Sequence, residues 1–333
     1  MSSNSISESE WVEYYKSLLD NNSSDLTRDE PTLGTALSPS PLDFPFNCSE
    51  IKKGIKRLKN SKKEGTDLIL NEFIKTGNST LILTLVKLFN KILKSGKFPK
   101  LWNHSLISSI YKSGDPNDCN NYRGISVTSC LGKLFTSLLQ KRLTDYLEIN
   151  KLISFNQGGF RSGYRTTDHI FILKTLINKY LHKLKSKLYV CFVDFKKAFD
   201  SIDRNSLFQK IENKGIGGNF LKLIKDMYSN TLYSCKFGDS YSEQILTTLG
   251  AKQGDSLKPT LFNIFVDDIK SSFIDNTQTK PVSLGVHTFN HLFYADDLVI
   301  LSESPTGLQH CLNALDNYCE KWRPNINMKK TKL

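Results

Sequence analysis

The chain has 333 residues, of which 39% are hydrophobic, so it can bury a core and does not have the composition of a disordered protein. Its formal net charge is +12. The first 50 residues carry two basic and nine acidic side chains, a net charge of −7, so the remainder carries +19. A basic body is typical of proteins that bind a polyanion, although lysines that only solvate a surface give the same count.

The seven cysteines form no C-x-x-C pair, which argues against a zinc site or a disulfide framework. No apolar leader follows a basic start, and no apolar run is long enough to span a bilayer. We therefore expect an intracellular protein that is neither secreted nor embedded in a membrane.

The N-terminal part of the chain reads as an extension followed by helices. A short amphipathic stretch at Trp11–Leu19 precedes a segment rich in Ser, Asn, Asp and Pro, so residues 1–48 are interpreted as an acidic extension or linker. Residues 49–100 are interpreted as a helical lead-in to the following domain. Helices are expected there over residues 49–59 and 81–93.

From residue 101 onward, apolar runs of strand length alternate with stretches of helical periodicity. A loop rich in Gly, Arg and Gln covers residues 155–166. Strands are predicted over residues 106–111, 188–193, 235–237, 244–249, 292–294 and 298–301. Helices are predicted over residues 131–147, 168–184, 207–211, 221–227 and 259–270.

Two apolar runs flank Ala295-Asp296-Asp297 and predict a β-hairpin with a pair of carboxylates at its tip. Two adjacent like charges repel each other and resist desolvation, so a buried hairpin gains no stability from them. Aspartate is also a good turn residue, which explains one of the two more readily than both. The pair therefore favours a functional role.

A third carboxylate, Asp194, ends another apolar strand. Mg²⁺ in proteins is usually held by one or two carboxylates together with substrate phosphates. Two such ions about 3.5–4 Å apart stabilise the attacking and leaving oxygens of an in-line phosphoryl transfer. We interpret Asp194 and Asp296 as the bridging ligands and Asp297 as a supporting carboxylate, whereas Asp200 and Asp203 are interpreted as helix caps.

These carboxylates lie within blocks that resemble the reverse transcriptases of non-LTR (LINE-type) retrotransposons. Phe192–Ile202 resembles motif A of that family, and Phe293–Ser302 resembles motif C. Four further blocks resemble the two fingers motifs, motif B and motif D, and they are Asn121–Val127, Gln157–His169, Gly250–Pro259 and Trp322–Thr331. The resemblance covers the chain from about residue 50 to its end.

The resemblance implies an α+β fold of the right-hand polymerase type. Residues 101–333 would form the reverse transcriptase domain, with fingers over about 101–185 and a palm over about 186–333. The palm would contain an antiparallel, ferredoxin-like (split βαβ) sheet. The family's thumb and its endonuclease domain have no counterpart, so we expect a truncated copy with a weaker grip on primer and template.

The resemblance also implies roles for single residues. Phe199 corresponds to the steric gate that disfavours ribonucleotides, and Lys330 corresponds to the motif D lysine, a candidate acid for the pyrophosphate leaving group. Either Arg161 or Arg165 could hold the triphosphate, and Arg161 is preferred, with Arg165 assigned to template and primer. The other residues implied for nucleotide binding are Phe195, Gln253 and Gly254, those for template and primer are Arg123 and Tyr294, and the backbone carbonyl of Phe195 is implied as a metal ligand.

Motif B departs from the family pattern, which usually continues after Gln-Gly with Cys-Pro-Leu-Ser-Pro. Here the sequence is Asp255-Ser256-Leu257-Lys258-Pro259. We expect Asp255 to add a negative charge near the nucleotide and Lys258 to add a compensating positive charge. This departure raises a question about normal activity.

The function predicted is RNA-directed DNA synthesis from a primer 3′-hydroxyl. It would use an RNA template, a DNA primer, deoxynucleoside triphosphates and two Mg²⁺ ions, with Mn²⁺ as a substitute. One alternative is another polymerase, either a group II intron-type reverse transcriptase or a viral RNA polymerase, and Phe199 argues against ribonucleotide synthesis. The other is a remnant that only binds nucleic acid. Action in the nucleus follows from the resemblance alone, and the oligomeric state does not follow from the sequence.

Overall fold

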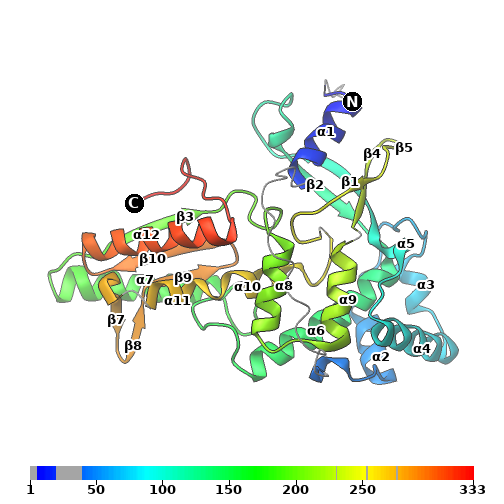
Figure 1. The fold of residues 1–333 in the computed structure, drawn as a ribbon, viewed down its shortest axis with the longest axis horizontal. Coiled ribbons are helices and arrows are strands. Elements are labelled where there is room, and N and C mark those ends of the chain that lie inside the picture. The colour runs from blue at the N-terminus through cyan, green and yellow to red at the C-terminus, as the bar shows by residue number, and fades with distance from the viewer. Residues whose placement is uncertain (1–5, 20–39, 230, 253, 275–276) are drawn as a thin grey trace. The chain divides into compact units, whose positions relative to one another are not determined.

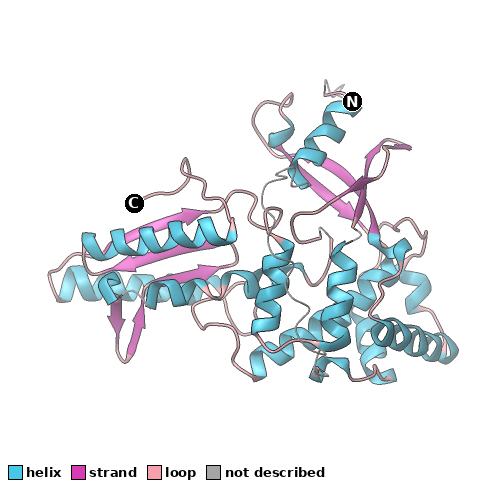
Figure 2. Cartoon of the chain, viewed as in Figure 1, coloured by secondary structure: helices cyan, strands magenta, loops and turns pink. Residues whose placement is uncertain are grey.

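The structure is a computed structural model that describes residues 6–19, 40–229, 231–252, 254–274 and 277–333. It divides into two compact units, each built from two separate stretches of chain. The first unit comprises residues 1–146 and 211–258, and the second comprises residues 147–210 and 259–333. Both contain helices and strands, which confirms the predicted α+β class (Figure 2).

The first unit contains a mixed sheet with the strand order β2-β1-β4-β5. Strand β1 (His104–Tyr111) pairs antiparallel with β2 (Tyr122–Val127) and parallel with β4 (Leu232–Phe237). Two short strands, β5 (Ser240–Tyr241) and β6 (Ile245–Leu246), both pair antiparallel with β4. The strand predicted over 244–249 is therefore real but shorter, and it pairs with the beginning of β4.

Helix α1 (Glu8–Leu19) packs against this sheet (Figure 1). Trp11 and Tyr15 are almost fully buried, in a cluster that also contains Ile107 and Tyr233 from the strands. The Tyr15 hydroxyl also forms a hydrogen bond of 2.9 Å with the Ser109 hydroxyl. The amphipathic stretch near the N-terminus thus contributes to the core of the first unit, because its apolar face covers the sheet.

The remaining helices of the first unit surround an aromatic core. Helix α4 ends at Gly96, whose φ of +62° caps the helix in the left-handed conformation. The helices are α2 (Cys48–Arg57), α3 (Asn71–Lys75), α4 (Ser79–Ser95), α5 (Lys100–Asn103), α6 (Cys130–Ile149), which ends in the second unit, and α9 (Gly218–Ser229). The core rings that contact one another are Phe46, Phe89, Phe98, Trp102 and Phe135.

The second unit contains a three-stranded antiparallel sheet with the order β3-β10-β9. Its strands are β3 (Tyr189–Asp194), β9 (His291–Tyr294) and β10 (Asp297–Ser302). Helix α12 (Pro305–Trp322) packs against β3 and β10, and helix α7 (Thr166–Ile177) packs against β9 (Figure 1). The predicted hairpin and the antiparallel sheet are both confirmed.

The other elements of the chain are short. Helix α7 continues as a π-helical turn at Asn178–Lys183, and the helix predicted over 259–270 is interrupted before Ile269. The remaining α-helices and strands of the described residues are α8 (Arg204–Asn213), α10 (Lys258–Val266), α11 (Ile269–Ile274), β7 (Val282–Leu284) and β8 (His287–Phe289). Asp203 accepts a hydrogen bond of 2.8 Å from the backbone N–H of Ser206, which confirms it as a helix cap. Within the described ranges, no helix is long and apolar enough to cross a membrane.

Candidate active site

The three predicted carboxylates lie at one end of the antiparallel sheet in the second unit. Asp194 is the last residue of β3 and lies directly opposite Asp297, the first residue of β10. Asp297 also pairs with Tyr294, so Ala295 and Asp296 form the two-residue turn between β9 and β10. Segments about a hundred residues apart in the sequence thus bring the carboxylates together.

The electrostatics of this cluster favour a bound cation. Burial raises the pKa of the Asp297 carboxyl, and the negative charges of Asp296 and Asp194 raise it further. Among the described residues, no group of three or more histidine, cysteine and acidic side chains forms a metal-binding cluster by itself. Mg²⁺ prefers oxygen ligands and commonly completes its coordination with water and substrate phosphates. The donor set is therefore of the kind that suits an ion shared with a phosphorylated substrate.

The segment after α12 runs beside β3. The Asn327 N–H donates to the carbonyl oxygen of Asp194, with 2.7 Å between N and O, and the Lys330 N–H donates to the carbonyl oxygen of Asn327 at 3.0 Å. The predicted motif D lysine thus lies in a turn attached to the backbone of Asp194. Phe195 stacks on Phe293, with 6.3 Å between the ring centroids and 9° between the planes.

Two other predicted residues take part in aromatic contacts. Phe199 is half-buried, and its ring centroid lies 6.0 Å from that of Phe160 and 4.5 Å from that of Phe262. This position is compatible with a core aromatic as well as with a gate. Tyr294 and His169 form a T-shaped ring pair with 6.1 Å between the ring centroids.

The two candidate arginines differ in environment. The Arg161 guanidinium donates to both carboxylate oxygens of Glu148, at 2.7 and 2.8 Å, and to the carbonyl oxygens of Ser154 and Gln157. Its side chain is only 7% exposed. All three of its nitrogens thus hold the loop together, whereas Arg165, the N-cap residue of α7, is exposed.

The residues expected from motif B and the first fingers motif belong to the first unit. Gly254 has a φ of +81°, and a Cβ there would lie 2.9 Å from the carbonyl oxygen of Ser126. A glycine is therefore required both by the backbone conformation and by this close approach. Arg123 is exposed on β2, and Gln253 lies outside the described residues.

Asp255 is half-buried with one carboxylate oxygen enclosed, and this burial raises the pKa of its carboxyl despite the nearby positive charge of Lys252. Lys252 is itself buried, and its ammonium donates to the carbonyl oxygen of Trp102 and to the side-chain oxygen of Asn103, both at 2.9 Å. We expected Lys258 to compensate Asp255, and the structure instead gives this role to Lys252. Lys252 and Asp255 line the same small cavity, together with Trp102.

Gln157 contacts the carboxylate hairpin, a role that the sequence did not predict beyond placing this residue in a fingers motif. Its side-chain oxygen accepts from the N–H of Ala295 at 3.1 Å, and its side-chain nitrogen donates to the carbonyl oxygen of Ala295 at 3.2 Å. The only sign in the sequence that Gln157 could be functional was its position in a fingers motif. Which backbone group it would contact is not encoded by local periodicity.

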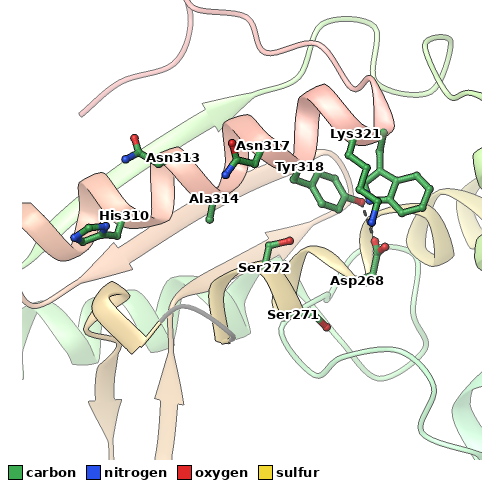
Figure 3. Close-up of a pocket in the computed structure, with 10 residues that line it drawn as sticks. Asp268, Ser271, Ser272, His310, Asn313, Ala314, Asn317, Tyr318 and Lys321 are labelled. Atoms are coloured by element: carbon green, nitrogen blue, oxygen red, sulfur yellow. Dashed lines mark hydrogen bonds between the residues drawn. The ribbon is translucent and has the colours of Figure 1, made fainter. Parts of the chain in front are cut away.

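A separate groove of about 640 Å³ lies between α11 and α12. Figure 3 shows Tyr318 and Asp268 pointing toward each other at one end, where the Tyr318 hydroxyl donates to the carboxylate at 2.9 Å. The groove is lined by Asp268, Ser271, Ser272, His310, Asn313, Ala314, Asn317, Tyr318, Lys321 and Trp322. None of the residues predicted from the sequence for catalysis or binding lines it.

Comparison with known proteins agrees with the fold and the motifs. The family described as "Reverse transcriptase (RNA-dependent DNA polymerase)" matches residues 110–333, and the chain belongs to this family. The chain is 29% identical over 309 residues to the probable RNA-directed DNA polymerase from transposon BS of Drosophila melanogaster, covering 90% of this chain and 33% of that protein. It is 30% identical over 295 residues to the RNA-directed DNA polymerase from mobile element jockey of Drosophila funebris, covering 86% of this chain and 31% of that protein.

These relatives confirm the predicted resemblance to retrotransposon polymerases. The chain spans about a third of the length of the curated relatives that it matches. Among solved structures, apo telomerase from Candida Tropicalis truncated from its C-terminal domain is similar, with a TM-score of 0.52 and 14% identity over 81% of this chain and 58% of that chain. This likeness supports the predicted polymerase fold.

Proposed function

We propose that this chain is the catalytic part of an RNA-directed DNA polymerase of a non-LTR retrotransposon. It would extend a DNA primer with deoxynucleoside triphosphates on an RNA template and release pyrophosphate. The observation that carries this proposal is the pairing of Asp194 with Asp297 across the sheet, with Asp296 in the adjoining turn. Membership of the reverse transcriptase family supports it.

Asp194, Asp296 and the backbone carbonyl of Phe195 are the groups that would hold two Mg²⁺ ions. Such ions lower the pKa of an attacking hydroxyl and neutralise developing charge on the phosphates. Asp297 would support the site as a third carboxylate beside the other two. Lys330, in the turn attached to the Asp194 backbone, would give a proton to the pyrophosphate.

The remaining assignments concern substrate contacts. Because Arg161 is occupied by Glu148 and two carbonyl groups, we assign the triphosphate to the exposed Arg165. Phe199 would exclude a ribose 2′-hydroxyl. Gln253 and Gly254 would contact the nucleotide and the template base, and Arg123 and Tyr294 would contact the template and primer.

Primer extension tests the proposal. The wild-type chain, Asp296→Ala and Asp316→Ala would be compared on an RNA template with deoxynucleotides and Mg²⁺. Asp316 is an exposed residue of α12 in the same unit, so its substitution removes the same charge away from the hairpin. We expect extension by the wild type and by Asp316→Ala, and a loss of about 100- to 1,000-fold in Asp296→Ala, the size seen when a charge-stabilising group is removed.

Nucleic-acid binding separates the two main outcomes. Binding that weakens as salt increases is expected for every variant, because the charge of the body is unchanged apart from one carboxylate. If no protein extends the primer and all bind it, the chain is a nucleic-acid-binding remnant and the polymerase proposal is wrong. If Asp296→Ala still extends the primer, the assignment of Asp296 as a Mg²⁺ ligand is wrong.

A further inference from the structure

The turn that presents Asp296 contains an unusual backbone conformation. Ala295 has a φ of +58°, in the left-handed region that residues with a side chain rarely adopt. Asp297 and Tyr294 already pair on either side of the turn. The conformation of Ala295 therefore sets the direction in which Asp296 leaves the hairpin, and it must be maintained by neighbouring groups.

One side chain satisfies both polar backbone groups of Ala295. The side-chain oxygen of Gln157 accepts from the Ala295 N–H at 3.1 Å, and its nitrogen donates to the Ala295 carbonyl at 3.2 Å. The same oxygen accepts from the Gly159 N–H at 2.8 Å. Gln157 is 2% exposed, so water does not compete for these bonds.

The backbone around Gln157 is fixed against the hairpin from both sides. The Phe293 N–H donates to the carbonyl oxygen of Asn156 at 2.8 Å, and the Gly158 N–H donates to the carbonyl oxygen of Phe293 at 2.9 Å. On the other side of the loop, the Asn263 amide of α10 donates to the carbonyl oxygen of Gly159 at 2.8 Å. Gln157 is thus held at a fixed distance from the turn.

We propose that Gln157 is a positioning residue that holds Ala295 in its left-handed conformation and thereby fixes Asp296 beside Asp194. Its role is to make the carboxylate pair competent to bind divalent cations. This inference rests on the proposed function, because it concerns the metal ligands of that site. Gln157 contacts the turn and needs no contact with substrate.

Direct metal binding is the first measurement. Gln157→Met has a similar length and removes all three side-chain hydrogen bonds, and Gln157→Glu retains the accepting oxygen. Mn²⁺ binding would be followed by electron paramagnetic resonance without nucleic acid. We expect affinity to fall about 10- to 100-fold in Gln157→Met, the range seen when groups that orient metal ligands are removed. Gln157→Glu should lie between this variant and the wild type.

Asn290→Leu provides a matched control. Asn290 is also buried in the second unit, and its amide donates to the Thr279 hydroxyl at 2.8 Å, away from the turn. Its substitution should lower the melting temperature without changing Mn²⁺ affinity. Amide hydrogen exchange at Ala295 and Asp296 should accelerate in Gln157→Met and remain unchanged in Asn290→Leu.

Kinetics give a further distinction. At saturating Mg²⁺, Gln157→Met should lower kcat and leave the KM for deoxynucleotides unchanged, and the Mg²⁺ concentration for half-maximal extension should rise. If Gln157→Met only melts earlier, as Asn290→Leu does, the positioning role is wrong and the proposed function stands. If the wild type neither binds Mn²⁺ nor extends a primer, the proposed function fails, and this inference fails with it.

Discussion

The turn at Ala295–Asp296 in the second unit and the loop at Lys252–Asp255 in the first unit are both expected to contact reactants, yet they are held in different ways. At each place a glycine lies against the backbone of another segment. Gly159 faces the Ala295–Asp296 turn, and Gly254 of the second loop faces Ser126. A Cβ on Gly159 would lie 2.0 Å from the Ala295 nitrogen, and a Cβ on Gly254 would lie 2.9 Å from a carbonyl oxygen. The first turn is held by a neutral amide, and the second by two buried charged groups.

This difference determines whether a substitution in each loop changes mainly activity or mainly stability. A neutral amide costs less to desolvate than a charged group does, so loss of its hydrogen bonds should cost less stability than loss of a buried charge partner and should show chiefly in the geometry of the turn. Buried charges are expensive to desolvate, and removal of one partner leaves the other without compensation. We therefore expect the carboxylate turn to respond through activity and the Lys252–Asp255 loop to respond through stability.

Lys252→Met should have the largest effect. It removes the positive charge that faces the buried carboxyl of Asp255 and leaves the carbonyl of Trp102 without this donor. The free energy of unfolding should fall by about 3–5 kcal/mol, the cost of breaking a buried pair from one side. Urea unfolding measures it.

The double variant Lys252→Met/Asp255→Asn tests the origin of that loss. Because the amide carries no charge, the double variant should be more stable than Lys252→Met alone. If the two losses add, the charges do not interact, and the proposed contrast between the loops is wrong. Asp255→Asn alone measures the separate cost of leaving the Lys252 ammonium without this carboxylate.

Gly159→Ala should act mainly on activity. The added methyl group would lie 2.0 Å from the Ala295 nitrogen, and backbone must move to make room for it. A shift of about 1 Å in a reacting group can lower a rate about 100-fold, so we expect a loss of that size in primer extension. Gly158→Ala is the control, because its methyl group meets the His169 ring at 3.1 Å and the ring can adjust. Equal activity of the two variants would contradict the tight fit.

The carboxylate hairpin was predictable because its signals are local. Two apolar runs with a pair of aspartates between them predict strands β9 and β10, and the strand that ends at Asp194 is also an apolar run followed by a carboxylate. The antiparallel pairing of these segments follows from the family motifs. The hairpin and the strand that ends at Asp194 were therefore assigned correctly from the sequence, whereas the strand predicted over 244–249 is shorter and the helix predicted over 259–270 is interrupted.

The partners of single polar side chains were not predictable in the same way. The engagement of Arg161 by Glu148 and the contact of Gln157 with Ala295 depend on how distant segments pack. The same holds for Lys252, because Lys252 and Lys258 both lie three residues from Asp255 in the sequence and nothing local distinguishes them. The packing of α1 on the first sheet was also hidden, because a polar segment follows the helix and suggested a linker.

Lys210 tests whether a buried charge in the second unit affects stability as the charges of the Lys252–Asp255 loop do in the first. We expect the change in the free energy of unfolding to be the smallest of those predicted. Its ammonium donates to Asp268 and to the Tyr318 hydroxyl, both at 2.7 Å, and burial lowers its pKa to about 8. Since the ordinary pKa is 10.5, the unfolded chain binds one more proton than the folded chain between these two values. The free energy of unfolding due to Lys210 therefore rises as the pH rises through this window.

The measurement is the difference in unfolding free energy between the wild type and Lys210→Met at pH 7 and at pH 10. The difference should move in favour of the wild type as the pH increases, by at most about 1.4 kcal/mol per pH unit. Subtraction of the variant removes the titration of cysteines and tyrosines that both proteins share. A difference that is independent of pH would show that Lys210 keeps its proton, and that its carboxylate and hydroxyl partners compensate its burial fully. In that case the buried charge of the second unit would be as insensitive to pH as the amide of Gln157.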